Sequence, residues 1–207
     1  ALPIWANLQW PGTSTKYTCE TETFYAQVWK AGVTEGAGQG TGITAWIGVS
    51  TANTDPSTWA ETDWHLATYN SAATSTNNDE YMYNVSGLTA GNYYIASRFK
   101  HTDGAYYYGA FNAAGGGAWD GTSNVNATLT INEVVVPTGD AAQFFCSAAS
   151  TVANLVATGS NIQWYAAATG GTALASTDVL ASGSHYYASQ TINGCESTTR
   201  LDVTVTI

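Results

Sequence analysis

The chain has 207 residues, a formal net charge of −10 and only five Lys and Arg residues. This balance excludes nucleic acid as a partner, because phosphate binding needs a clustered basic face, and it disfavours anionic lipid for the same reason. Hydrophobic residues make up 44% and charged residues 10% of the chain, and no apolar run reaches membrane-spanning length. This composition favours a packed core built from strands and turns.

Short runs of alternating apolar and polar residues, rich in aromatic and β-branched side chains, follow one another along the chain. Clusters of Gly, Asn, Ser and Thr separate them, which is typical of a β-sandwich. The first series of predicted strands covers residues 3–10, 22–30, 43–50, 64–69, 80–86, 92–101, 105–111 and 125–134. The second series covers residues 141–147, 161–167, 184–192 and 199–207, and the segment 151–159 fits either a strand or a short helical turn.

The two series are separated by the segment VVVPTGD (134–140), which contains Pro137 and Gly139. Seven of the eight Trp residues precede this break. We therefore predict an all-β chain of two tandem immunoglobulin-like β-sandwich domains, a Trp-rich one over residues 1–135 and a second over 136–207. The short linker is expected to leave the domains little independent freedom.

A repeated strand entry supports two related domains. LTAGNYYIASRF (88–99) and LASGSHYYASQT (180–191) share Leu, Gly, Tyr, Ala and Ser at matching places. Gly-x-Tyr at the start of a late strand resembles the tyrosine corner of immunoglobulin-like sandwiches, in which a Tyr hydroxyl bonds the preceding loop. Tyr93 occupies that position in the first copy and His185 in the second. This signature predicts a fold and no chemistry.

Three cysteines are present, Cys19, Cys146 and Cys195. Cys146 and Cys195 lie near the ends of the second predicted domain, and a domain of about 70 residues is marginally stable without a covalent bond across it. We therefore favour a Cys146–Cys195 disulfide over two buried thiols, in an oxidising compartment. Cys19 is predicted to be a packed thiol, with an intermolecular bridge as the alternative.

The second domain resembles a known module. The pieces FFCSAAS, TVANLVATGSNIQWY, AATGGTALAST, LASGSHYYASQTINGCES and LDVTVTI are similar to an immunoglobulin-like module of secreted and surface proteins of Bacteroidota. This resemblance covers residues 143–207. It implies an oxidised Cys146–Cys195 pair, an extracellular or outer-surface location and a role as spacer or stalk.

Residues 5–131 resemble a second module of the same type IX-secreted proteins. The matching pieces are WANLQWPG, FYAQVWKAGVTEGAGQGTGITAWIGVS, NNDEYMYNV, GNYYIASRF and YYYGAF. That β-sandwich accompanies nucleases, peptidases and adhesins as an accessory domain without an assigned activity, and it is distantly similar to modules beside starch-degrading enzymes. The resemblance implies an accessory role here.

No motif for catalysis stands out. The chain lacks a G-x-S-x-G elbow, an H-E-x-x-H pair and a phosphate-binding loop, and His65, His101 and His185 are scattered. The Gly-rich run EGAGQGTG (35–42) is interpreted as a strand connector. We predict that the protein has no catalytic residues and no required cofactor.

Acidic loop residues raise the question of calcium, which binds carboxylate and carbonyl oxygens. Asp55, Glu61 and Asp63 share one loop, and Asp79 and Glu80 are adjacent; Asp103 and Asp120 lie in Asp-Gly turns. No EF-hand spacing occurs, so solvated turn residues are the favoured interpretation. A Ca²⁺ site that includes Asp55, Asp79 and Glu80 is the alternative.

Aromatic residues near loops are the strongest hint of a ligand. Trp59, Trp64, Trp119 and Tyr107 could stack on sugar rings, with neighbouring polar groups bonding the hydroxyls, although packing in the core is the favoured interpretation. Trp5, Trp10, Trp29 and Trp46 lie inside strand patterns and are predicted to be core. The function predicted is a non-catalytic extracellular structural or adhesive unit, such as a repeating subunit of a surface stalk or filament. The alternative is a carbohydrate-binding accessory module of a larger secreted enzyme. The expected partners are other copies of the chain, neighbouring domains or a polysaccharide.

Overall fold

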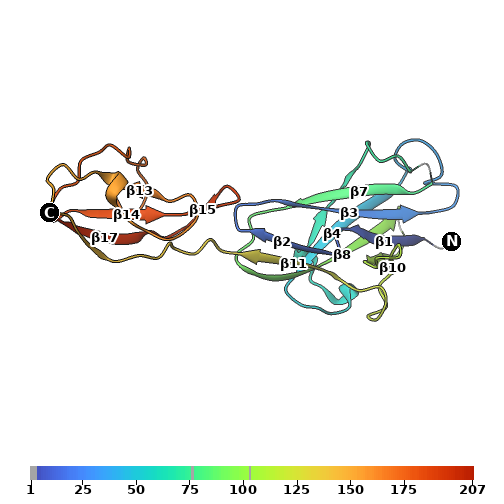
Figure 1. The fold of residues 1–207 in the computed structure, drawn as a ribbon. Coiled ribbons are helices and arrows are strands. Elements are labelled where there is room, and N and C mark those ends of the chain that lie inside the picture. The colour runs from blue at the N-terminus through green and yellow to red at the C-terminus, as the bar shows by residue number, and fades with distance from the viewer. Residues whose placement is uncertain (1–3, 76, 103) are drawn as a thin grey trace. The chain divides into compact units, whose positions relative to one another are not determined.

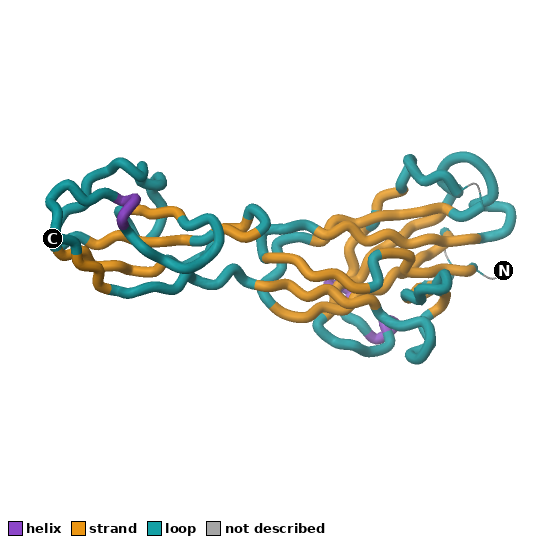
Figure 2. The backbone as a smooth tube through the Cα atoms, in the orientation of Figure 1, coloured by secondary structure: helices purple, strands orange, loops and turns teal. Residues whose placement is uncertain are grey.

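The computed structural model describes residues 4–75, 77–102 and 104–207, which form strands and loops with three single-turn 3-10 helices (Figure 2). The chain folds as two compact units. Unit 1 comprises the residues up to Lys16 and Glu20–Asn132, and unit 2 comprises Tyr17–Cys19 and Glu133–Ile207. The expected boundary after residue 135 therefore lies just inside unit 2, which also includes a three-residue segment from near the N-terminus. Within the described residues, no helix is long and apolar enough to cross a membrane.

Unit 1 is built from two β-sheets (Figure 1). The first has the order β1 (Trp5–Trp10), β3 (Glu22–Trp29), β7 (Asp79–Val85) and β6 (Thr68–Tyr69), with antiparallel neighbours. The second has the order β10 (Gly117–Ala118), β9 (Tyr107–Ala110), β8 (Gly91–His101), β11 (Ala127–Asn132) and β2 (Thr13–Tyr17), and β4 (Ile43–Ser50) pairs with both β8 and β5 (Trp64–Leu66). The all-β architecture predicted from the sequence is confirmed.

The core of unit 1 follows from the two-residue period of its strands. Along β3, Phe24, Ala26 and Val28 are buried while their neighbours are partly exposed, because successive side chains of a strand point to opposite faces. Leu129 on β11 and Phe99 on β8 meet them in the same core cluster. Alternation in the sequence is thus sufficient to predict which face of β3 is buried.

The predicted strand over residues 64–69 proves to be two strands in different sheets. β5 pairs with β4 in the second sheet, and β6 pairs with β7 in the first. Ala67 lies between them, and its N–H donates to the Ala45 carbonyl at 2.9 Å. The sequence pattern also did not predict β2. Its residues TSTKY are polar, as is typical of an edge strand with one face towards solvent.

Close approach of backbones makes Gly109 on β9 a sensitive position. A Cβ there would lie 2.7 Å from the Cα and carbonyl carbon of Asn7 on β1. We expect Gly109→Ala to lower the free energy of unfolding of unit 1 by about 2–3 kcal/mol, because backbone cannot move aside as a side chain can. Gly117→Ala is the matched control, since its nearest neighbour is the Asn124 side chain at 3.1 Å. Chemical denaturation measures both, and equal losses would contradict this prediction.

The tyrosine corner predicted at Gly91-Asn92-Tyr93 is present in unit 1. The Tyr93 hydroxyl donates to the carbonyl oxygen of Thr89 at 3.0 Å, and Leu88 is half-buried against the core cluster. The bond fixes the loop that enters β8, as in immunoglobulin-like sandwiches.

Unit 2 has one regular sheet and an irregular opposite layer. The sheet has the order β12 (Ala142–Phe144), β17 (Leu201–Thr206), β14 (His185–Ser189) and β13 (Gln163–Tyr165), and β15 (Thr191–Ile192) with β16 (Cys195–Glu196) forms a separate hairpin. Opposite the sheet, the segment 151–159 contains the 3-10 helix η3 (Val152–Asn154), so of the two interpretations the helical turn is right. Buried residues of both layers form one core cluster: Val152, Leu155, Trp164, Leu180, Tyr186, Ala188, Val203 and Val205.

The corner of unit 2 uses a different residue from the one expected. The hydroxyl of Tyr186, not the side chain of His185, accepts a hydrogen bond from the Ala181 N–H at 2.9 Å. His185 is exposed and lies 2.7 Å from Asp202 through its Nδ1. The two corners are therefore offset by one residue, because it is Tyr186 and not His185 that points into the core of unit 2.

Candidate functional site

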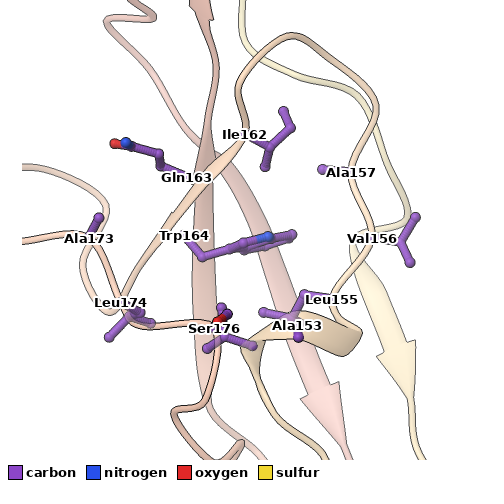
Figure 3. Close-up of a pocket in the computed structure, with 11 residues that line it drawn as sticks. Ala153, Leu155, Val156, Ala157, Ile162, Gln163, Trp164, Ala173, Leu174 and Ser176 are labelled. Atoms are coloured by element: carbon purple, nitrogen blue, oxygen red, sulfur yellow. The ribbon is translucent and has the colours of Figure 1, made fainter.

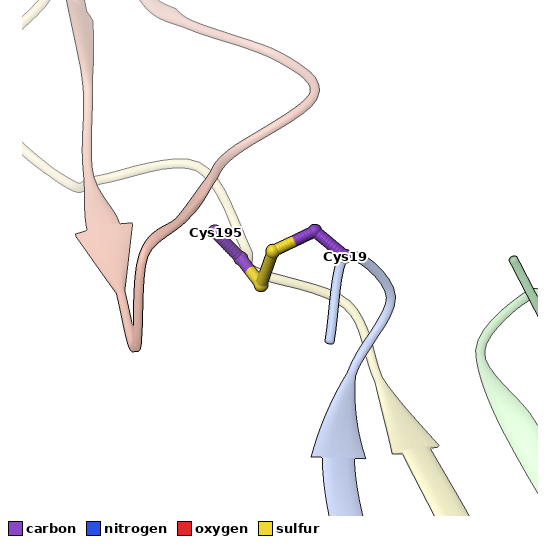
Figure 4. The surroundings of a disulfide bond; sticks show 2 residues. All are labelled: Cys19 and Cys195. Atoms are coloured by element: carbon purple, nitrogen blue, oxygen red, sulfur yellow. A yellow bond between two sulfur atoms is a disulfide. The ribbon is translucent and has the colours of Figure 1, made fainter. Parts of the chain in front are cut away.

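The disulfide of this chain joins Cys19 to Cys195, and the expected Cys146–Cys195 pair is wrong. The Cα atoms of Cys19 and Cys195 are 5.5 Å apart, whereas Cys146 is exposed and unpaired. Cys19 lies in the segment that follows β2, and Cys195 lies in the β15–β16 hairpin (Figure 4). Cys195 is 2% exposed, so the bond is anchored in the interior of unit 2.

The register of the sheet explains why Cys146 and Cys195 do not pair. β12 runs parallel to β17, with Phe144 opposite Thr206, so Cys146 follows at the end where β17 finishes. Cys195 precedes Leu201 at the end where β17 begins. The six residues of β17 span about 17 Å, and the Cα atoms of a disulfide are rarely more than about 7 Å apart. Proximity to the ends of the domain in sequence did not mean proximity in space.

Trp59 and Trp64, two of the predicted sugar-stacking residues, are buried. Each is 8% exposed, and their rings contact one another at 5.5 Å between centroids. They cover Gly48 of β4, where a Cβ would lie 2.8 Å from both indoles. The packing interpretation is therefore right for this pair, and neither indole is available as a flat platform for a sugar.

The buried side chain that organises these aromatic residues is Arg98 on β8, which is 3% exposed. Its guanidinium carbon lies 4.3–4.9 Å from the ring centroids of Trp46, Trp64 and Tyr106, a cation–π arrangement. Both terminal nitrogens donate to Glu61, at 2.8 and 2.7 Å. These hydrogen bonds hold the pKa of Glu61 below its usual range. We call Arg98, Trp46, Trp64, Tyr106 and Glu61 the Arg98 cluster. This cluster fixes the loop between β4 and β5 on the outer face of the sheet.

A small aromatic cavity of about 190 Å³ lies in unit 1, between β1, β3, β9 and β10. It is lined by Ile4, Trp5, Ala6, Trp29, Tyr107, Tyr108 and Ala118. The indole N–H of Trp29 is buried and has no hydrogen-bond partner. The structure thus brings the predicted residue Tyr107 together with Trp5 and Trp29, which the sequence assigned to the core.

Trp119, the third tryptophan predicted to stack on a sugar, and Trp10, predicted to be core, lie elsewhere. Trp119 is half-buried and does not line the aromatic cavity, although its backbone N–H donates to the Tyr108 carbonyl at 3.1 Å. Trp10, predicted to be core, is 58% exposed and contacts Tyr25 at 6.0 Å. Trp10 is the last residue of β1, the edge strand of the first sheet, so no further strand of that sheet flanks it on one side.

The predicted calcium residues each serve a separate structural contact. Asp55 caps η1 (Pro56–Thr58) by accepting from the Ser57 N–H at 2.9 Å. Glu80 accepts from Asn70 at 2.6 Å, and Asp79 accepts from the Gly40 N–H at 2.6 Å. Asp79 and Glu80 are consecutive on β7 and so point to opposite faces. In the described ranges no group of three or more His, Cys, Asp or Glu side chains could hold a metal ion; Asp103 lies outside those ranges.

Asp79 is a buried carboxyl, 2% exposed, that anchors the Gly-rich loop between β3 and β4. Burial raises its pKa above the usual range, because desolvation penalises the charged form. The folded state therefore binds this proton more tightly than the unfolded state does. The contribution of Asp79 to stability is largest when it is protonated, and it declines as pH rises from about 4 through the folded-state pKa.

We expect Asp79→Asn to keep the hydrogen bond to Gly40 and to remove this decline. Relative to the native chain, the variant gains stability as pH rises from 4 to 7. Asp79→Ala leaves the buried Gly40 N–H without an acceptor and costs about 1–3 kcal/mol. Urea unfolding at several pH values measures both. A native chain and an Asn variant with parallel pH profiles would contradict the assignment.

Each of the three histidines contacts a neighbouring side chain. His65 stacks on Tyr83 at 5.0 Å, and His185 stacks on Tyr187 at 6.3 Å and contacts Asp202. His101 approaches the Thr102 hydroxyl at 3.4 Å, which is exposed.

A groove of about 440 Å³ opens in unit 2 beside Trp164 (Figure 3). In the view of Figure 3, Ile162 lies above the indole of Trp164, and Leu155, Leu174 and Ser176 lie below it. The groove exists because the layer opposite the sheet consists of η3 and loops, which cover the sheet less completely than strands would. Trp164 itself is 7% exposed, so its indole fills the core beneath the groove.

Comparison with known proteins finds one similarity, and it lies within unit 2. Residues 134–207 match the family model described as Ig-like domain, CHU_C associated. The immunoglobulin-like resemblance of residues 143–207 is thereby confirmed, whereas the accessory-module resemblance of residues 5–131 stays a prediction. No curated protein matches the chain.

Proposed function

We propose that the chain is a non-catalytic structural module of a secreted or cell-surface protein. The observation that carries this proposal is the Cys19–Cys195 disulfide, since structural disulfides persist in oxidising compartments outside the cytosol. The immunoglobulin-like match over residues 134–207 supports it. So does an acidic surface poor in Lys and Arg, which suits a soluble spacer and not a nucleic-acid or lipid binder.

The acidic and histidine side chains, which are the common catalytic groups, also support a structural role, because several of them hold other parts of the fold. Glu61 neutralises the buried Arg98, Asp79 and Asp55 fix loops, and His185 contacts Asp202. β1 pairs with β3, and β17 pairs with β12 and β14, so both terminal strands are used within their own units. Association with other copies or with neighbouring domains would therefore use surfaces and not donated strands.

The test is made on cells of the source organism. One portion of the cells is quenched with acid, and its free thiols are alkylated and counted. In a second, unquenched portion the protein is located by antibody labelling of intact and of permeabilised cells. We expect labelling of intact cells or of the medium and one alkylated thiol per chain. A protein found only inside permeabilised cells, with three alkylated thiols, would overturn the proposal.

A second candidate function is binding of a carbohydrate by unit 1, and the aromatic cavity is the observation that favours it. Trp5, Trp29 and Tyr107 provide ring faces for the C–H groups of a sugar, and the unpartnered Trp29 N–H can donate to a hydroxyl. A polysaccharide panel followed by calorimetry tests it. We expect Tyr107→Ala and Trp29→Phe to weaken binding at least tenfold and Trp10→Ala, outside the cavity, to leave it unchanged. Absence of binding, or an equal loss in all three variants, would reject it.

A further inference from the structure

The Cys19–Cys195 disulfide closes nearly the whole chain into a covalent loop. The sequence separation of the two cysteines is 176, so only the residues up to Cys19 and from Cys195 to Ile207 lie outside the loop. A covalent path therefore connects the two ends of the chain without passing through residues 20–194. The existence of this covalent path depends only on which two cysteines are bonded.

We propose that the disulfide makes this chain a tension-bearing tether, in which a force applied between the two chain ends bypasses residues 20–194. The inference deepens the structural role proposed above and depends on it only for its biological setting. Force enters through β1 and β2, crosses the two sulfur atoms, and leaves through β16 and β17. β3 to β11, the Glu133–Asp140 segment and most of unit 2 lie outside this path.

The elements on the path differ in how they are held. β1 is the edge of the first sheet of unit 1, and β2 is the edge of the second. β17 lies between β12 and β14, so it is paired on both sides. With the disulfide intact, even complete detachment of these strands extends the chain only by the length of the short segments outside the loop. The bond thereby limits extension whatever the stability of either unit.

The extended length of the chain reports the bypass directly. At about 3.5 Å per residue, the residues enclosed between Cys19 and Cys195 correspond to about 600 Å of extended chain. A Cys146–Cys195 bond would enclose about 50 residues, or about 170 Å, and a Cys19–Cys146 bond about 130 residues, or about 440 Å. The three pairings therefore differ by amounts that single-molecule extension resolves.

The experiment stretches the full chain between handles attached at its two ends by enzymatic peptide ligation, which leaves the cysteines untouched. Cys146→Ser is present in every sample, because Cys146 is exposed and could exchange with the disulfide. We expect the fully stretched length to increase by about 600 Å when the disulfide is reduced with a phosphine. Cys19→Ser should show the long extension without reductant.

A matched variant tests the bypass and not the mere presence of a bond. Twenty Gly and Ser residues are inserted between Gly36 and Ala37, in an exposed loop of unit 1 where a Cβ on Gly36 would meet no atom. The insertion should leave the oxidised length unchanged and add about 70 Å to the reduced chain.

An oxidised chain that reaches the full reduced length, or that lengthens with the insertion, would overturn the proposal. Contour lengths are measured on the purified protein, whereas the structural role is tested by the location of the protein on cells. The two proposals can therefore fail separately. A bypass in a protein that is not at the cell surface would contradict the proposed location, and a surface protein without a bypass would contradict the proposed tether.

Discussion

Replacing Cys19 by Ser should lower the free energy of unfolding of unit 2 by about 2–4 kcal/mol. Without the disulfide, the unfolded chain gains the freedom that a long closed loop denies it. Unit 2 has a single small core cluster, and domains of this size are marginally stable. Cys19 is exposed, so the substitution removes the bond without placing a hydroxyl in the core, as Cys195→Ser would. A loss of this size lowers the melting temperature of a small domain by about 10–25 °C.

Hydrogen exchange followed by mass spectrometry measures the loss for each unit separately. Amides of β14 and β17 should exchange faster in Cys19→Ser, whereas amides of β3 and β8 in unit 1 should change little. Cys146→Ser is the matched control, because it replaces an exposed, unpaired thiol and should shift stability by less than about 0.5 kcal/mol. If Cys146→Ser destabilised unit 2 as much as Cys19→Ser does, the assigned pairing would be wrong.

Replacing Arg98 by Ala should lower the free energy of unfolding of unit 1 by about 2–4 kcal/mol, the second large effect. The substitution removes a buried side chain that three aromatic rings surround, leaving a cavity and ending the cation–π contacts. It also frees the loop that carries Glu61. Urea unfolding gives the free energy, and the fluorescence of Trp46 and Trp64 should shift because both rings contact the guanidinium.

Arg98→Lys distinguishes the charge from the shape of this side chain. Lys keeps the positive charge but lacks the planar fork that donates to both oxygens of Glu61, so we expect an intermediate loss. The pKa of Glu61 is lowered in the folded state. The stability that Glu61 contributes is therefore fully present above the ordinary Glu pKa of about 4.3, and it is lost as pH falls below that value and through the lower folded-state pKa. Arg98→Ala should remove this acid dependence. An Ala variant as stable as the native chain would show that the Arg98 cluster is incidental.

Local patterns were enough to predict the fold class. The alternation in ITAWIGVS gave β4 at its observed bounds, and Gly91-Asn92-Tyr93 gave the corner of unit 1. Both depend on neighbours in sequence, namely the two-residue period of a strand and the turn before it. β2 was missed for the same reason, because an edge strand with polar residues shows no alternation of hydrophobicity.

The Arg98 cluster and the disulfide could not be predicted in the same way, because both depend on contacts between segments that are distant in the sequence. Arg98, Glu61 and Trp46 come together only after β8 pairs with β4 and the loop after β4 folds over the sheet. One signal was present in the sequence: Trp46, Tyr94 and Tyr108 all fall on the face of their strands opposite the core, which is unusual for a face in contact with water. The disulfide depended on which end of β17 each cysteine approaches, and spacing along the chain does not contain that information.

The most direct test of this account is mass spectrometry of the unreduced protein after alkylation of free thiols. Trypsin alone leaves Cys146 and Cys195 on one peptide, because no Lys or Arg lies between them, so a second cleavage before Asp178 is needed to separate them. The structure predicts a peptide containing Cys19 linked to one containing Cys195, with Cys146 carrying the alkyl group. A linked Cys146–Cys195 pair with alkylated Cys19 would contradict it.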